Sequence, residues 1–300
     1  MIVRVLGSAA GGGVPQWNCA CANCRAARDG RQPLRLQSSL ALSADGRSWI
    51  LLNCSPDVAA QIEAFAPLQP TQLRGTPIAG MLLTDANVDH LGGLATLRQA
   101  GTNGFTLRSS SAVRSIATAQ PAFAPFASPP HRWLEAALDA ECGPADAADP
   151  IGNALTVRAR AVDGLTPGYA GRRSTPGAVV AYEIAEPAGA RLLFAPVFAS
   201  VDDLLLQAVA RADVAFLDGT FYSDDELIAE RLLPKRARDL GHQAVGGPNG
   251  TLARLSAVRT RVIFTHLNNS NPMLDPGSEA HANVRAAGAE IAFDGMELRL

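Results

Sequence analysis

The sequence predicts an α/β protein with a mixed β-sheet system packed by helices, and two patterns along the chain support this class. Short apolar runs bounded by turn residues recur over the 300 residues, as expected of strands, and helical patterns fall between many of them. Strand candidates occur both in direct succession and in alternation with helices, which a pure parallel barrel does not show. We therefore expect sheets that are covered by helices.

The expected elements begin at the N-terminus, where a strand-like run at Met1–Leu6 precedes a series of glycines. Further strands are expected at Ser39–Leu42, Trp49–Asn53, Gly80–Leu83, Thr156–Ala161, Val179–Ile184, Arg191–Phe194, Val214–Leu217 and Arg261–Phe264. Helices are expected at Asp57–Phe65, Gly92–Ala100, Asp202–Ala210, Asp224–Leu232, Thr251–Val258 and Ser278–Ala287. Several of these helices open with Asp, Ser or Thr, which cap helix N-termini.

Two stretches interrupt this order of elements and are expected to be loops over one face. Gln120–Pro150 is rich in Ala and Pro, and Asp163–Gly177 holds several glycines and prolines. Neither is polar or long enough for a domain linker, and the sequence shows no internal repeat. We therefore expect a single domain over residues 1–300 with insertions near 120–150 and 163–177.

The composition narrows the class of partner. A hydrophobic content of 47% and a net charge of −2 are typical of globular proteins and give no basic surface for nucleic acid or an anionic membrane. No apolar stretch approaches the roughly 18 residues that a membrane span needs. The first residues lack the charged and long apolar regions of a signal peptide, so a cytoplasmic location is expected.

Three cysteines form a close cluster after the glycine run at residues 11–13. Cys19, Cys21 and Cys24 give the spacing C-x-C-x-x-C, so three soft thiolates can converge on one ion, which favours a structural zinc. Three unrelated cysteines are one alternative. A redox role is another, and it is weaker because redox motifs pair two cysteines at a helix start, whereas no clear helix is expected after these three.

A second candidate metal site follows the strand Gly80–Leu83. Asp89 and His90 stand side by side in the turn after this strand, and glycines follow that allow a close approach of the backbone. A carboxylate and an imidazole delivered at a strand end suit a metal ion outside the sheet. The alternative is a solvated turn in which the aspartate caps the next helix.

At this turn the sequence resembles the metallo-β-lactamase superfamily, whose signature is His-x-His-x-Asp-His. Asp89 and His90 match its last two positions, whereas Asp85 and Asn87 replace its first two. Together with the cysteine motif and the segments Leu217–Phe221 and His266–Pro272, the resemblance narrows to the pyrroloquinoline quinone (PQQ) biosynthesis protein B family and spans essentially the whole chain.

The resemblance implies a four-layer αββα sandwich with metals held by loops at one edge of the two sheets. Binuclear members bind one ion with the first two histidines and a mid-chain histidine, and the other with the Asp-His pair and a late histidine. The first set is absent here, because no histidine lies between His131 and His242. The resemblance therefore implies one catalytic ion on Asp89, His90 and His266.

Other site residues are also implied by the resemblance. Pro196 stands where the aspartate that bridges the two ions is expected, and Asp218 is the candidate to compensate, as a ligand or through contact with one. His242 resembles a histidine that assists proton transfer in phosphodiesterase-like relatives, although a purely structural role is the alternative. Asn269 stands where such relatives place the fourth ligand of the cysteine-bound zinc, and an amide oxygen is a poorer zinc ligand than imidazole.

The expected chemistry follows from the ligand set. Two histidines and one carboxylate with open positions are the pattern of non-haem iron(II) oxygenases. Loss of one ion weakens hydrolysis at a binuclear site. The resemblance implies work on a small-molecule PQQ precursor, a cross-linked glutamate and tyrosine, so we expect an iron-dependent hydroxylase, with Arg172 and Arg173 as candidates to bind substrate carboxylates. The alternatives are a carrier that helps PQQ or its precursor reach the periplasm and a metal-dependent hydrolase.

Overall fold

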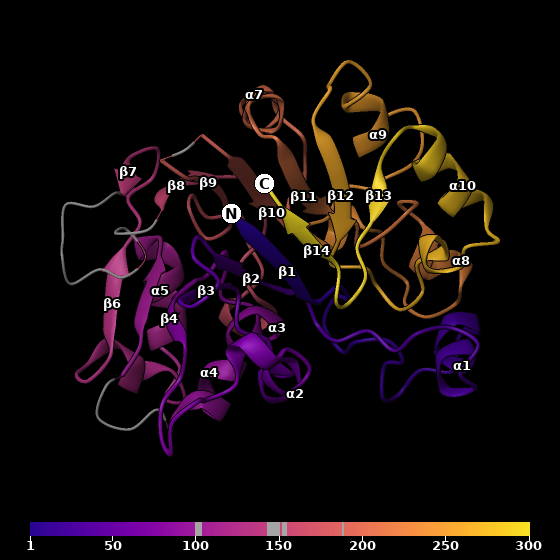
Figure 1. The fold of residues 1–300 in the computed structure, drawn as a ribbon. Coiled ribbons are helices and arrows are strands. Elements are labelled where there is room, and N and C mark those ends of the chain that lie inside the picture. The colour runs from indigo at the N-terminus through magenta and orange to yellow at the C-terminus, as the bar shows by residue number, and fades with distance from the viewer. Residues whose placement is uncertain (100–103, 143–150, 152–154, 188) are drawn as a thin grey trace.

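Two β-sheets lie face to face and helices cover their outer faces, as Figure 1 shows. The computed structural model describes residues 1–99, 104–142, 151, 155–187 and 189–300. Both sheets have seven strands, and the N- and C-terminal strands pair with each other in the first sheet. This is the αββα sandwich that the family resemblance implied.

The first sheet has the order β14-β1-β2-β3-β4-β5-β6. Its strands are β1 (Ile2–Gly7), β2 (Ser39–Ser43), β3 (Trp49–Leu52), β4 (Ile78–Leu82), β5 (Thr106–Ser109), β6 (Arg132–Glu135) and β14 (Glu297–Arg299). Pairing is antiparallel from β14 to β3 and parallel from β3 to β6. The helices that pack on its outer face are α2 (Val58–Glu63), α4 (Gly93–Leu97) and α5 (Ser111–Thr118).

The second sheet has the order β13-β12-β11-β10-β9-β8-β7. Its strands are β7 (Glu141–Cys142), β8 (Thr156–Ala161), β9 (Val180–Ala185), β10 (Arg191–Ala195), β11 (Val214–Asp218), β12 (Arg261–Thr265) and β13 (Glu290–Ile291). Pairing is antiparallel from β7 to β10 and parallel from β10 to β13. The helices on this side are α7 (Asp203–Arg211), α8 (Glu226–Ala229), α9 (Thr251–Arg254) and α10 (Glu279–Ala286).

The core lies in three layers because successive side chains of a strand point to opposite faces of the sheet. On β2, Leu40 and Leu42 point between the sheets, where they join Tyr182 and Phe216 of the second sheet, whereas Ala41 packs beneath the helices of the first sheet. A separate cluster fills the space between the second sheet and its helices. The strand ends are thereby held at one edge of the sandwich.

The expected strands are all present, with ends that differ by up to two residues. Several helices are shorter than expected, and α4 already ends at Leu97. The segment Asp224–Leu232 keeps helix only over α8, because Arg231 adopts a left-handed backbone with φ of 55° that ends it. The expected helix Thr251–Val258 stops at Arg254.

One helix was not expected. α1 (Ala22–Arg28) begins directly after Cys21, so the prediction that no helix follows the cysteines was wrong. The signal was weak because the helix has only seven residues and no side-chain cap. The short helices α3 (Val88–Leu91) and η4 (Gly168–Ala170) lie in the segments that carry Asp89 and the arginine pair.

The first of the two expected insertions is only partly described, and it contains the strands β6 and β7 besides loop segments. Residues 143–150 of the first, and Ala100 of the expected helix Gly92–Ala100, lie outside the described residues. The second insertion is closed by a bridge between Leu165 and Ser174. The single domain with these insertions stays a prediction. No helix in the described parts of the chain is long and apolar enough to cross a membrane.

Candidate metal centre

The candidate site lies where strands of both sheets end. β4 of the first sheet leads through a short loop into α3, which carries Asp89 and His90. In the second sheet, β11 ends at Asp218 and its parallel neighbour β12 leads into His266. The carboxyl ends of parallel strands meet at one edge of a sheet, which is where α/β proteins bind ligands.

The structure brings Asp89, His90 and His266 together. Asp89 Oδ2 lies 3.1 Å from His266 Nε2 and 3.8 Å from His90 Nε2. One ligand atom of each residue lies within 4.8 Å of the other two. The two histidines are buried, while the Asp89 side chain is 19% exposed. The three predicted residues therefore share one small volume that opens to solvent on the side of the carboxylate.

Both imidazoles are anchored through Nδ1. His90 Nδ1 lies 2.6 Å from Asp85 Oδ2, and His266 Nδ1 lies 2.7 Å from Thr220 Oγ1. His90 Nε2 is buried and has no hydrogen-bond partner among the described residues. A buried polar atom without a partner is costly. A divalent cation at this point would satisfy it, so the residues present fit a metal ion.

The charges in the site favour an anionic Asp89. Burial raises the pKa of Asp89, but His90 and His266 outweigh this effect and hold the pKa well below its usual range. Burial lowers the pKa of His90, yet Asp85 and Asp89 raise it to about 9. For His266, burial lowers the pKa. A cation that binds here must displace the proton of His90 Nε2, so its affinity should rise with pH.

Asp218 and His242 form a second pair against His266. His242 Nδ1 lies 2.7 Å from Asp218 Oδ2, and the His242 ring stacks on the His266 ring with centroids 5.6 Å apart. The carboxylate also accepts hydrogen bonds from Thr220 N, Thr220 Oγ1 and Phe198 N. Asp218 is therefore engaged on both oxygens, and its ligand atom also lies within 4.8 Å of those of His242 and His266, so these three residues form a second group that could hold a metal ion.

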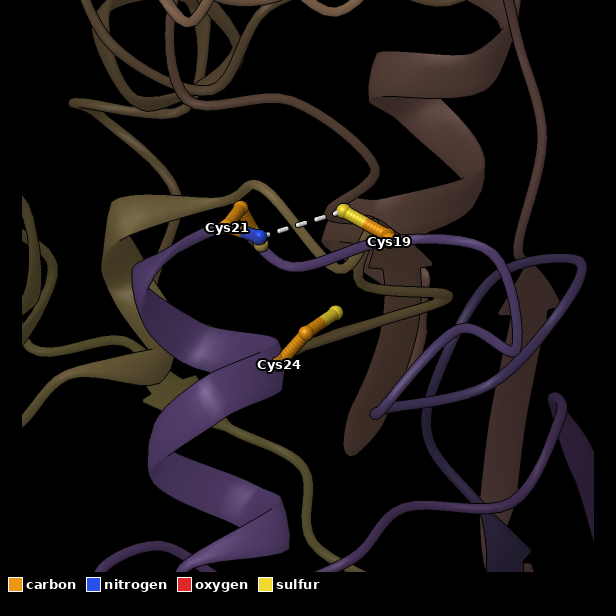
Figure 2. A group of neighbouring side chains, drawn as sticks. All are labelled: Cys19, Cys21 and Cys24. Atoms are coloured by element: carbon orange, nitrogen blue, oxygen red, sulfur yellow. Dashed lines mark hydrogen bonds between the residues drawn. The ribbon is translucent and has the colours of Figure 1, made fainter.

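The three clustered cysteines also converge. Figure 2 shows Cys24 on α1 and Cys19 and Cys21 on the loop that leads into it, with a hydrogen bond from Cys21 N to Cys19 Sγ. The sulfur atoms lie within 4.8 Å of one another. Burial raises the pKa of Cys24 to about 12, so its thiol stays protonated unless a cation displaces the proton.

Asn269 lies against this cluster. Its Nδ2 is 3.1 Å from Cys19 Sγ, 3.4 Å from Cys24 Sγ and 3.5 Å from Cys21 Sγ. The amide nitrogen, and not the oxygen expected of a ligand, faces the sulfurs. α1 begins directly after Cys21, so the cluster does have the helix start that redox motifs use. The convergence of three sulfurs on one point still suits a metal ion.

The predicted substrate arginines lie on the second insertion and differ in their contacts. Arg172 Nη1 reaches Leu240 O at 3.3 Å, two residues before His242. Arg173 Nη1 instead caps its own turn at Ala170 O, 2.8 Å away. Both side chains are exposed. Only Arg172 therefore extends toward the loop that carries a site histidine.

Some residues at the site were not predicted. Thr220 orients both Asp218 and His266, and its only sequence signal is its place two residues after the strand end. Gly11 lies close to the carboxylate of Asp89, since a Cβ atom added to Gly11 would be 3.2 Å from Asp89 Oδ2. Tyr169 donates a hydrogen bond to Ala86 O, beside Asp85. These contacts join segments far apart in the chain, which local patterns do not reveal.

The fold and the site define a protein of the metallo-β-lactamase superfamily, and residues 48–267 match the family model described as a beta-lactamase superfamily domain. The coenzyme PQQ synthesis protein B of Rhizobium meliloti is 40% identical over 311 residues, which cover 99% of this chain and 97% of the relative. That of Ectopseudomonas mendocina is 40% identical over 311 residues, with both chains fully covered. The chain belongs to the coenzyme PQQ synthesis protein B family.

Solved structures agree with this assignment. Zn(2+)-bound PqqB from Methylobacterium extorquens matches with a TM-score of 0.91 and 36% identity, and each chain is covered completely. A diphosphatase from the PhnP family matches with a TM-score of 0.68 and 18% identity, over 100% of this chain and 97% of the other. The second match shows a shared fold only.

Proposed function

We propose that this protein is a mononuclear non-haem iron(II)-dependent hydroxylase of the tyrosine-derived PQQ precursor. One observation carries the proposal: Asp89, His90 and His266 place one carboxylate and two imidazoles around a single point, and the buried His90 Nε2 has no hydrogen-bond partner in the described parts of the chain. This is the ligand set of iron(II) oxygenases. Its relatives act in coenzyme PQQ synthesis, which supports the choice of substrate.

Iron(II) at this site would supply the electrons that activate dioxygen. Hydroxylation puts one oxygen atom on the tyrosine ring and reduces the other to water, so each turnover takes two electrons from an external reductant such as ascorbate, and two protons. His242 is placed to hold or deliver a proton, because Asp218 anchors its Nδ1 and leaves Nε2 available. Arg172 is the candidate to bind a substrate carboxylate.

A structural zinc on Cys19, Cys21 and Cys24 is part of the proposal. The Zn(2+)-bound relative supports a zinc site in this family, and thiolates prefer zinc over the harder divalent ions. Asn269 contributes hydrogen bonds to the sulfurs, and a turn of its amide would offer the oxygen as a fourth ligand. The cytoplasmic location of the reaction stays a prediction.

The test is anaerobic loading of the metal-free protein with iron(II), followed by addition of the cross-linked glutamate–tyrosine substrate, ascorbate and isotopically labelled dioxygen. We expect oxygen uptake and one labelled oxygen atom in the product, and neither result with zinc in place of iron. Equal turnover by the zinc form would overturn the oxygenase. Zinc-dependent cleavage of phosphodiesters or esters would indicate the hydrolase, and binding of PQQ without conversion would indicate the carrier.

A further inference from the structure

Asp85 occupies the first position of the superfamily signature, where a metal-binding histidine is usual, and its surroundings point to a different use. Its side chain is completely buried, and it belongs to none of the candidate metal clusters in the described part of the chain. Its nearest contact is His90 Nδ1, 2.6 Å from Oδ2. We infer that Asp85 is a positioning residue, which holds the His90 ring so that Nε2 points to the ion.

The Asp85 carboxylate is itself held on both oxygens. Thr84 Oγ1 donates to Oδ2 at 2.8 Å. Asn87 donates to Oδ1 twice, from its backbone nitrogen at 2.9 Å and from Nδ2 at 2.8 Å. A carboxylate that accepts these bonds loses them if it turns to coordinate an ion. The two departures from the signature, Asp85 and Asn87, thus act together as a support for His90.

The support matters because an imidazole can present either nitrogen. A buried ring that turns over would offer Nδ1 to the ion and leave Nε2 pointing away. A charge-assisted hydrogen bond to Nδ1 selects one orientation, keeps the proton on that nitrogen and makes Nε2 a better electron donor. Thr84 Oγ1 lies 3.4 Å from the same nitrogen and is too distant to replace the carboxylate.

The test compares zinc binding by the parent protein with Asp85→Asn and Asp85→Ala, by competition with a chelator. The cysteine-bound zinc serves as an internal reference. We expect the zinc ion at Asp89, His90 and His266 to bind about 10- to 100-fold more weakly in Asp85→Ala, which is the usual effect of losing such a partner. The loss of affinity should be smaller in Asp85→Asn, whose amide oxygen still accepts a hydrogen bond. Asp294→Asn is the matched control, since Asp294 is a half-buried carboxylate that accepts hydrogen bonds from Leu36 N and Ser8 Oγ.

Nuclear magnetic resonance of the zinc-loaded protein supplies a reading that a merely structural role would not change. The His90 Nδ1 proton should resonate far downfield in the parent, move upfield in Asp85→Asn and vanish by exchange in Asp85→Ala. A zinc affinity within about threefold of the parent in Asp85→Ala would overturn the inference, because it lies below the usual range. If that variant does not fold, an unchanged affinity and proton signal in Asp85→Asn would overturn it.

The inference rests on the proposed function only for the position of the ion. Its test contains no iron, oxygen or substrate. A failure to observe hydroxylation would therefore not contradict the positioning role of Asp85. Unchanged zinc binding by the Asp85 variants would likewise not contradict the proposed hydroxylase activity.

Discussion

His266 Nε2 lies 3.1 Å from Asp89 Oδ2, although 177 positions separate the two residues along the chain. Asp89 follows β4 of the first sheet and His266 follows β12 of the second, so the contact exists only when the two sheets pack. His266 also adopts a left-handed backbone with φ of 58°, which is unusual for a residue other than glycine. Such strain often occurs at functional sites, where the surrounding structure maintains it.

Replacing His266 with alanine should remove the catalytic ion and leave the cysteine-bound zinc. Only Asp89 and His90 would remain, so we expect the affinity of this site to fall by more than about 100-fold, beyond the usual effect of losing an outer partner. Metal content by mass spectrometry checks this. His281→Ala is the control, because His281 Nδ1 contacts Met273 O and no residue of the site. Retention of both ions by His266→Ala would contradict the assigned ligand set.

Asn269→Ala should weaken the structural zinc without abolishing it. The amide donates hydrogen bonds to the three sulfurs, and we expect a loss of affinity of about tenfold, as for other partners of ligating atoms. Cys24→Ser removes a thiolate and should lose the ion at the same zinc concentration. Dialysis against a zinc buffer compares the two. Equal loss in both variants would make Asn269 the fourth ligand.

The stability of the metal-free protein should depend on pH through the ionisation of Glu226. Burial raises the pKa of Glu226 from 4.5 to about 7, although hydrogen bonds from Ser270 and Tyr222 N oppose the shift. A raised carboxyl pKa means that the folded state binds more protons, so this group's contribution to stability is fully present below pH 4.5 and is lost as pH rises through about 7. At 1.36 kcal/mol per pKa unit the loss is on the order of 3 kcal/mol.

Glu226→Gln is the variant that isolates this contribution, since an amide can donate to Ser270 and accept from Tyr222 N. Urea unfolding of the parent and the variant in the presence of a chelator, from below pH 4.5 to above pH 7, measures this contribution. As pH rises, the free energy of unfolding of the variant should increase relative to that of the parent protein. A constant difference between the two proteins would refute the assignment.

Arg172→Gln should raise KM for the precursor with little change in kcat. Its guanidinium reaches Leu240 O near His242, where a bidentate bond to a carboxylate stabilises bound substrate and transition state equally. An increase in KM of about tenfold corresponds to the lower part of the range for charged hydrogen bonds. Arg173→Gln is the matched control, because Arg173 contacts its own turn. Equal effects of the two changes would remove the distinction between them.

Local patterns in the sequence were sufficient for much of the fold. Strands such as β8 and β12 were predicted because their apolar residues and bounding turns lie within a few positions of each other. The shortest elements were not predicted. β13 has two residues, and α1 has one face of small side chains and no side-chain cap. The αββα arrangement itself came from the resemblance, since periodicity does not state which sheet a strand joins.

Sequence alone determined which residue types were available: three close cysteines, the Asp89–His90 pair and the late histidines His242, His266 and His281. Only the tertiary structure decided how they are used. It places His266 beside Asp89 and His242 in hydrogen-bond contact with Asp218. Asp85, which stands at the sequence position of a ligand, contacts His90 Nδ1 instead. The physical reason is that burial and periodicity are local properties, whereas the direction of a side chain depends on strand register and on the contact of two sheets that are distant in the chain.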